Sequence, residues 1–189
     1  MKKLMMIAIM MIAAVSANAQ NEAGQASIKP MAGINIATIT KYTNTLSRVG
    51  LAAGLEFEYG VTNNFGLSAG VLYSMQGVKL KQFGGDNKET VKLDYINIPI
   101  LANYYIARGL AIKAGIQPGF NVKKDNLEET NDAKGDVKGF ALSVPVGLSY
   151  EFSNVVIDAR WNLALTKVYK EGDFKHSLFT ITLGYRIPF

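Results

Sequence analysis

Hydrophobic and polar residues alternate one by one along most of the chain beyond residue 27. The closing segment FTITLGYRIPF (179–189) shows the pattern most simply, because every second residue is large and apolar, from Phe179 to Phe189. A period of two predicts β-strands with one apolar face. No window shows a 3.6-residue period, so we expect hardly any helix. The predicted strands cover residues 28–37, 48–59, 65–78, 91–106, 110–121, 140–151, 155–165 and 177–189.

The connections between these strands are alternately short and long. Three are short: GVTNN (60–64), ARG (107–109) and FSN (152–154). The long, hydrophilic ones cover residues 38–47, 79–90, 122–139 and 166–176. This alternation is typical of an up-and-down barrel whose two ends face different surroundings. We therefore expect both chain ends and the short turns at one end of the barrel, and the long loops at the other.

Glycine indicates which face of the predicted barrel points inward. A water-facing strand has no reason to prefer glycine, which weakens it, whereas the concave inside of a narrow barrel needs small residues. The polar face is therefore expected to line the lumen, and the apolar face to meet lipid. The predicted fold is all-β, an eight-stranded antiparallel up-and-down transmembrane β-barrel whose last strand pairs with its first. Nine mid-strand glycines share the polar face: Gly33, Gly50, Gly54, Gly66, Gly70, Gly115, Gly119, Gly147 and Gly184.

Charged residues also fall on the inward face. Because the lumen of an eight-stranded barrel is just wide enough to be filled by side chains, we predict a structural ion network there; the alternative is a path for cations or protons. Arg160 and Arg186 are the expected anchors, with Asp158 and Glu56 as partners, since a guanidinium bridges two carboxylates. The network is predicted from Glu56, Glu58, Lys113, Asp158, Arg160 and Arg186, and Lys29 and Glu151 share their face.

The first nineteen residues differ from the rest. Lys2 and Lys3 precede the apolar run LMMIAIMMIAAV (4–15), and the small-residue site ANA follows at 17–19. This order is typical of a secretory signal peptide, so we expect a signal peptide at 1–19 and a β-barrel domain at 20–189. The composition excludes some classes of partner and chemistry. The chain has a net charge of +5 but no clustered basic tract, which argues against nucleic acid as a partner. The absence of cysteine excludes disulfides and thiol chemistry.

Candidate catalytic groups are few. His176 is the single histidine and lies next to Ser177, with Asp173 nearby, but adjacency in sequence does not orient a Ser-His-Asp triad. One histidine cannot build a zinc site. We therefore predict no enzyme activity, no cofactor and no metal. The carboxylates of the longest connection have nothing to hold them as a catalytic pair: Glu128, Glu129 and Asp132.

Three prolines lie inside consecutive predicted strands: Pro99, Pro118 and Pro145. Proline removes a donor from the ladder and belongs at bulges or edges, and a closed barrel has no edge. We therefore predict a shared band of bulges. A lateral opening for a hydrophobic ligand is the alternative.

Several segments resemble the small outer-membrane β-barrel proteins often labelled PorT-like or "porin family". The resemblance covers essentially all of the chain after the signal peptide. It implies a barrel in a Gram-negative outer membrane, surrounded by lipid, with short turns in the periplasm. An aromatic last residue resembles the signal read by the barrel-assembly machinery, which implies this role for Tyr185 and Phe189. The segments are AGINIATIT, LDYINIPILANYY, AGIQPGF, VPVGLSYEF, VVIDARWNLALT and LGYRIPF.

From these observations we expect an integral outer-membrane protein without enzyme activity, with a structural or interaction role through its long extracellular loops. The PorT resemblance implies an alternative, an accessory role in protein secretion or assembly with a secretion complex as partner. A further alternative is a conduit for small hydrophobic ligands.

Overall fold

The computed structural model describes residues 23–39, 45–46, 48–81, 88–125, 139–166 and 176–189. In this part of the chain we find no helix with the length and apolar character that crossing a membrane requires. The strands are β1 (Ala26–Ile39), β2 (Thr45–Leu46), β3 (Arg48–Thr62), β4 (Phe65–Lys81), β5 (Lys88–Asn97), β6 (Ile100–Ala107), β7 (Leu110–Asp125), β8 (Phe140–Phe152), β9 (Val155–Ala164), β10 (His176–Tyr185) and β11 (Ile187–Pro188).

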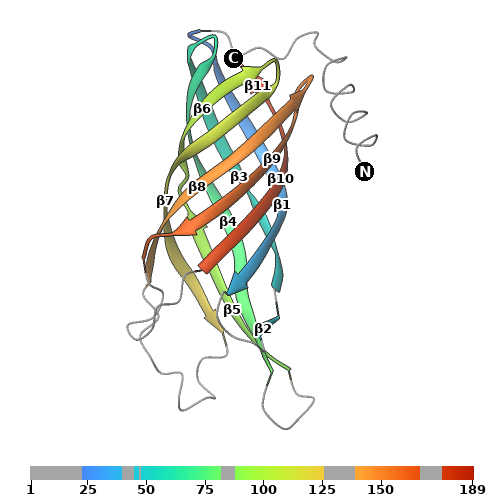
Figure 1. Cartoon of the computed structure of the whole chain (residues 1–189), viewed down its shortest axis with the longest axis vertical. Helices are drawn as coiled ribbons and strands as arrows, with labels where there is room; N and C mark the ends of the chain where they lie inside the picture. The colour runs from blue at the N-terminus through green and yellow to red at the C-terminus, as the bar shows by residue number, and fades with distance from the viewer. Residues whose placement is uncertain (1–22, 40–44, 47, 82–87, 126–138, 167–175) are drawn as a thin grey trace.

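These strands form the eight staves of one closed antiparallel barrel (Figure 1). We call each of the eight barrel strands a stave. Three staves are interrupted and therefore carry two labels each: β2 and β3, which both pair with β4; β5 and β6, which both lie between β4 and β7; and β10 and β11, which both pair with β1. β1 closes the barrel, because Ala32 pairs with Ala53 of β3 on one side and with Leu183 of β10 on the other. The predicted fold class is confirmed.

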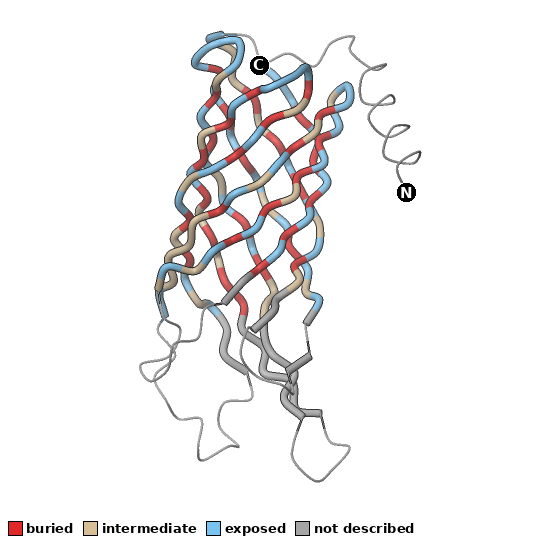
Figure 2. Tube along the Cα trace, in the orientation of Figure 1, coloured by how far each residue is buried: buried red, intermediate tan, exposed pale blue. Residues whose placement is uncertain are grey.

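The apolar face points outward and the polar face inward. Leu55, Val146 and Leu183 are 52%, 39% and 58% exposed, whereas Glu56 and Lys113 are 0% and 2% exposed. Burial alternates residue by residue along each stave (Figure 2), as the period of two requires. The interior is therefore polar, and the exposed aliphatic surface is the face that meets hydrocarbon.

The inward glycines allow neighbouring strands to approach closely. A Cβ on Gly33 would lie 1.9 Å from the carbonyl oxygen of Ile181, and one on Gly115 would lie 2.0 Å from that of Ile100. Neither contact is possible for a larger residue without moving the backbone. A Cβ would likewise lie within 3.0 Å of a backbone carbonyl oxygen at Gly50, Gly54, Gly70 and Gly147. At Gly119 and Gly184 it would meet the side chains of Asn97 and Lys29 instead.

The short turns and the C terminus lie at one end of the barrel (Figure 1). Asparagines from two turns tie neighbouring staves together there: Asn64 Nδ2 donates to the Tyr105 carbonyl at 3.2 Å, and Asn154 Nδ2 to the Arg186 carbonyl at 2.9 Å. The third turn uses Gly109 at φ 75°, where a Cβ would lie 2.3 Å from the Glu151 carbonyl oxygen. The long connections all leave from the opposite end.

The predicted band of bulges at the prolines is wrong. The register continues unchanged across Pro99, since Leu72 pairs with Asn97 before it and Ala69 with Ile100 after it. Pro118 and Pro145 also pair in register, with Leu142 and Asn162. The prolines interrupt single ladder bonds without inserting a residue. Among the described strands, register shifts occur instead at Gly60/Thr62, Asp94/Tyr95 and Tyr105/Ala107.

Candidate functional site

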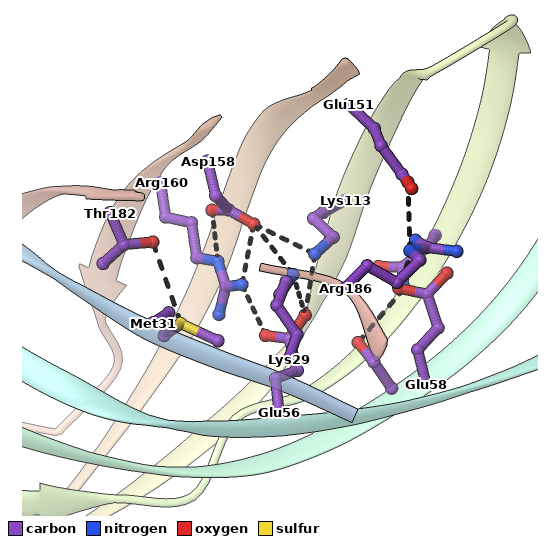
Figure 3. A network of polar contacts seen from close by, with 12 residues as sticks. Lys29, Met31, Glu56, Glu58, Lys113, Glu151, Asp158, Arg160, Thr182 and Arg186 are labelled. Atoms are coloured by element: carbon purple, nitrogen blue, oxygen red, sulfur yellow. Dashed lines mark hydrogen bonds and ion pairs between the residues drawn. The ribbon is translucent and has the colours of Figure 1, made fainter. Parts of the chain in front are cut away.

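Five charged side chains meet at the centre of the lumen. Lys29 comes from β1, Glu56 from β3, Lys113 from β7, and Asp158 and Arg160 from β9 (Figure 3). Each is at most 4% exposed. They converge because every stave directs alternate residues inward and the lumen of eight staves is narrow. We call these five residues the central cluster.

Glu56 is the common acceptor of the central cluster. Its Oε1 lies 2.7 Å from Lys29 Nζ and 2.8 Å from Lys113 Nζ, and its Oε2 accepts from Arg160 Nη2. One carboxylate thus joins three staves that are far apart in sequence. Charge-assisted hydrogen bonds of this kind are shorter and stronger than neutral ones.

Arg160 and Lys113 join the second carboxylate to the first. Arg160 donates to Asp158 through Nε at 2.6 Å and through Nη2 at 2.8 Å, a bidentate contact. Lys113 Nζ lies 2.9 Å from Asp158 Oδ2. Both cations therefore bridge Asp158 and Glu56, which is the arrangement in which a buried charge is compensated on several sides.

A second cluster lies nearer to the short turns. Arg186 Nε lies 3.0 Å from Glu151 Oε2, and Arg186 Nη2 lies 3.3 Å from Glu58 Oε2. Tyr105 completes the group: its hydroxyl accepts from Arg186 Nη2 at 2.6 Å and donates to Glu58, and the guanidinium carbon lies 5.9 Å from the centre of its ring. We call these four residues the mouth cluster.

The two clusters balance one another in charge. The central cluster has three cations and two carboxylates, and the mouth cluster has one cation and two carboxylates. Together they hold four positive and four negative groups in adjacent layers of the lumen. Since an uncompensated charge away from water is expensive, this balance favours a closed interior.

Toward the long-loop end the lumen is lined by uncharged polar groups. Asn35 donates to Ser74 at 2.6 Å, and Thr180 donates to Asn35 at 2.8 Å. Between this layer and Arg160, the space lined by Met31, Leu72 and Gln117 has no room for a water molecule. The described part of the lumen is therefore packed with side chains rather than open as a pore.

The structure brings the predicted lumen residues together, but not with the partners expected for Arg186. Arg160 binds Asp158 and Glu56, whereas Arg186 binds Glu58 and Glu151. Arg186 lies close to the chain end, at the height of these two carboxylates. Tyr105 was not identified from the sequence; its position, one residue after the outward Tyr104, was the available signal.

The candidate catalytic groups lie largely beyond what the structure describes. Asp173, Glu128, Glu129 and Asp132 are outside the described residues, and the side chains of His176 and Ser177 are likewise not placed. Within the described residues, no three acidic or histidine side chains converge as a metal site requires. The aromatic residues named as an assembly signal are outward: Tyr185 is 53% exposed and Phe189 is 73% exposed.

Comparison with known proteins agrees with this architecture. A family model described as "Outer membrane protein beta-barrel domain" matches residues 18–170. A search of curated protein sequences finds no match.

Solved structures share the fold. Ail of Yersinia pestis in a phospholipid nanodisc is 18% identical, with a TM-score of 0.52 and coverage of 87% of this chain and 99% of that chain. Ail with the heparin analogue sucrose octasulfate is 17% identical, with a TM-score of 0.51 and coverage of 87% and 99%. OprG from Pseudomonas aeruginosa is 15% identical, with a TM-score of 0.50 and coverage of 90% and 99%. At these identities the likeness concerns the fold alone.

Proposed function

Because the chain belongs to the family of outer membrane protein beta-barrel domains and is an integral protein of that membrane, we propose that it is a non-enzymatic scaffold with a closed lumen. Its partners bind at the end that carries the long connections. Lipid covers its apolar wall.

The central cluster is the observation that carries this proposal. A solute crossing the lumen would have to separate Glu56 and Asp158 from Lys29, Lys113 and Arg160, all of which are at most 4% exposed. Breaking a buried ion pair costs about 3–5 kcal/mol, and several pairs would open at once. We therefore infer that the network is structural and that the protein is no general porin.

The shape of the long-loop end supports the interaction role. β4 and β5 remain paired as far as Lys81 and Lys88, and β7 continues to Asp125. On the other side of the barrel, β1 and β10 end at Ile39 and His176. One side of the wall thus projects beyond the other (Figure 1). The long connections that leave from this rim lie outside the described residues.

Two measurements test the proposal. Reconstituted in planar bilayers, the protein should give no discrete conductance steps, whereas a triple variant Glu56→Ser, Lys113→Ser, Arg160→Ser, which removes the central cluster, should leak. Photo-crosslinking in intact cells should trap a partner from position Asn131 of the longest connection and none from Asn63 of a short turn. Wild-type conductance, or adducts from Asn63 alone, would contradict the proposal.

We further propose that residues 1–19 are the signal peptide and that Tyr185 and Phe189 are read by the barrel-assembly machinery. The Phe189 N–H donates to the Ala26 carbonyl at 2.9 Å, and its ring lies 6.2 Å from that of Phe57. An ordered, outward aromatic terminus supports recognition during assembly. Accumulation of unprocessed chain, or unchanged assembly of a chain that lacks Phe189, would argue against these roles.

A PorT-like accessory role in secretion rests on sequence resemblance, and co-purification of a secretion complex with the tagged chain would favour it. The conduit alternative finds little support. The described lumen is packed, and the register is continuous across Pro99, Pro118 and Pro145.

A further inference from the structure

The outer wall of the barrel has a hollow where the first and last staves meet. It has a volume of about 490 Å³ and an almost wholly apolar lining. Residues from β1, β3, β9 and β10 form it, among them Pro30, Ala32, Ala53, Val155, Leu183 and Tyr185. We call it the seam groove.

Small outward side chains create the seam groove. Ala32 lies between Ala53 of β3 and Leu183 of β10 in the sheet. The outward residues on either side of Ala53 along β3 are larger: Leu51 and Leu55 are 61% and 52% exposed. The floor at Ala32 and Ala53 therefore lies close to the backbone, and the larger side chains of Val155, Leu183 and Tyr185 line its side.

The seam below this groove also lacks a ladder bond. The Phe189 N–H donates to the Ala26 carbonyl, and hydrogen-bonded pairs recur at every second residue of an antiparallel ladder. The register between β1 and the last stave is the same on both sides of this point, since Ser27 pairs with Pro188 and Met31 with Gly184. Counting four residues from Ala26 and Phe189 therefore makes Pro30 and Tyr185 a hydrogen-bonded pair. Proline has no N–H, so the Tyr185 carbonyl receives no hydrogen bond from β1. Apolar contacts over this pair therefore contribute more to closure than they do along the rest of the seam between β1 and β10.

The seam groove lies in the half of the membrane nearer the short turns. Tyr185 precedes the terminal Phe189 by four residues, which corresponds to a height of about 10 Å for a strand tilted by roughly 40°. Groups at this height face the acyl chains of the periplasmic leaflet. Lipid already covers the surrounding wall, so the groove continues an established lipid interface.

We propose that the seam groove is a specific binding site for one acyl chain of a phospholipid of the periplasmic leaflet. A flexible chain fills a narrow apolar hollow and restores the dispersion contacts that small side chains leave open. It also covers the seam at the pair that lacks a ladder bond. The bound lipid thereby stabilises the closure of the barrel.

A second copy of the chain fits the groove poorly. A two-fold interface places the same patch against itself, so two hollows would face each other and enclose a void. Protein interfaces are packed nearly as densely as protein interiors. The concave shape therefore favours a thin, flexible occupant.

Native mass spectrometry of the detergent-solubilised barrel tests this proposal. Dioleoyl phosphatidylethanolamine is titrated into the wild type, into Ala53→Leu, which fills the groove, and into Ala114→Leu, an outward alanine on β7. Gel mobility of unboiled samples verifies folding. Ala32→Leu is the second filling variant if Ala53→Leu does not fold.

We expect the wild type and Ala114→Leu to bind one lipid distinctly more tightly than the next. Ala53→Leu should lose this first affinity by about tenfold, as expected if about two methylenes lose their contacts. Equal first and second affinities in the wild type would overturn the proposal. So would equal binding by all three proteins, or a wild-type dimer that Ala53→Leu abolishes.

Discussion

Replacing Glu56 by glutamine should destabilise the barrel more than any other single Glu→Gln change in the described lumen. Glu56 is 0% exposed and accepts from Lys29, Lys113 and Arg160. Glutamine has nearly the same size but no charge. The three cations of the central cluster would then face Asp158 as their only carboxylate.

The expected loss follows from the contacts of Glu56. Breaking a buried ion pair by removing one partner costs about 3–5 kcal/mol. Three charge-assisted hydrogen bonds at about 1.5–3 kcal/mol each would total about 4.5–9 kcal/mol, but the glutamine oxygen still accepts from the lysines, so the loss falls toward the lower end. We therefore expect the free energy of unfolding of Glu56→Gln to fall by about 3–5 kcal/mol.

A second substitution separates charge balance from loss of contacts. Lys113 lies between Glu56 and Asp158, and Lys113→Met together with Glu56→Gln restores the original net charge of the cluster. We expect the double variant to be less destabilised than the sum of the single variants by about 1–3 kcal/mol, as is typical of residues in one network.

Urea unfolding in lipid vesicles measures these differences, with the fluorescence of Trp161, the only tryptophan, as the signal. Glu151→Gln is the matched control, because the same chemical change removes a contact to Arg186 at 3.0 Å from a residue that is 8% exposed. It should cost less than half as much. If Glu151→Gln costs as much as Glu56→Gln, or if Glu56→Gln and Lys113→Met are additive, the central role given to Glu56 is wrong.

Three further substitutions test the wall and the terminus. Gly33→Val should give no folded band on an unboiled gel, because its Cβ would meet the Ile181 carbonyl oxygen at 1.9 Å, while Ala32→Val on the outer face should fold. Val146→Arg, on the lipid-facing wall, should lower the free energy of unfolding by about 2–4 kcal/mol, and Tyr59→Arg near the short turns by about 0–1 kcal/mol; equal costs would contradict the assigned membrane position. Phe189→Ala should reduce the amount of folded barrel in outer membranes, measured by immunoblot of unboiled samples, without lowering the urea midpoint of the protein that does fold.

The alternation of apolar and polar residues was sufficient to predict whether each side chain points inward or outward, but not which residues it contacts. Leu55 outward and Glu56 inward follow from a period of two, and glycine decided which face was inside. Glu56 and Arg160 are 104 residues apart, and their contact depends on the stagger of the staves around the barrel. The alternation of apolar and polar residues tells which face a side chain is on, but not how far neighbouring staves are shifted along the barrel axis. For this reason Arg186 was assigned partners from the wrong layer of the lumen.

The prolines were misinterpreted for a related reason. A proline within a strand indicates that a ladder bond is missing, and a bulge is one way to accommodate the loss. Around Pro99 the loss is accommodated in register instead, since Gly70 donates to the Pro99 carbonyl at 3.0 Å and Ile98 to the Pro118 carbonyl at 2.8 Å. Neighbouring N–H groups thus hold the staves together on both sides. The sequence of one stave does not reveal these donors on others.

The ion network also explains how one register is selected. A slip of one residue turns apolar side chains inward, but a slip of two residues keeps every apolar side chain in lipid, so hydrophobic burial does not oppose it. Such a slip of β3 would move Glu56 by about 7 Å along the stave, away from Lys113 and Arg160. It would also place residues that have a Cβ where Gly50 and Gly54 now lie, and a Cβ there would collide with the backbone of β4. Charge pairing and glycine packing thus discriminate where the hydrophobic effect does not. We therefore expect amide NMR spectra of the Glu56→Gln, Lys113→Met double variant to show additional peaks from β3 and its neighbours β1 and β4. A single set of peaks would mean that the glycines alone select the register and that the ion network does not contribute.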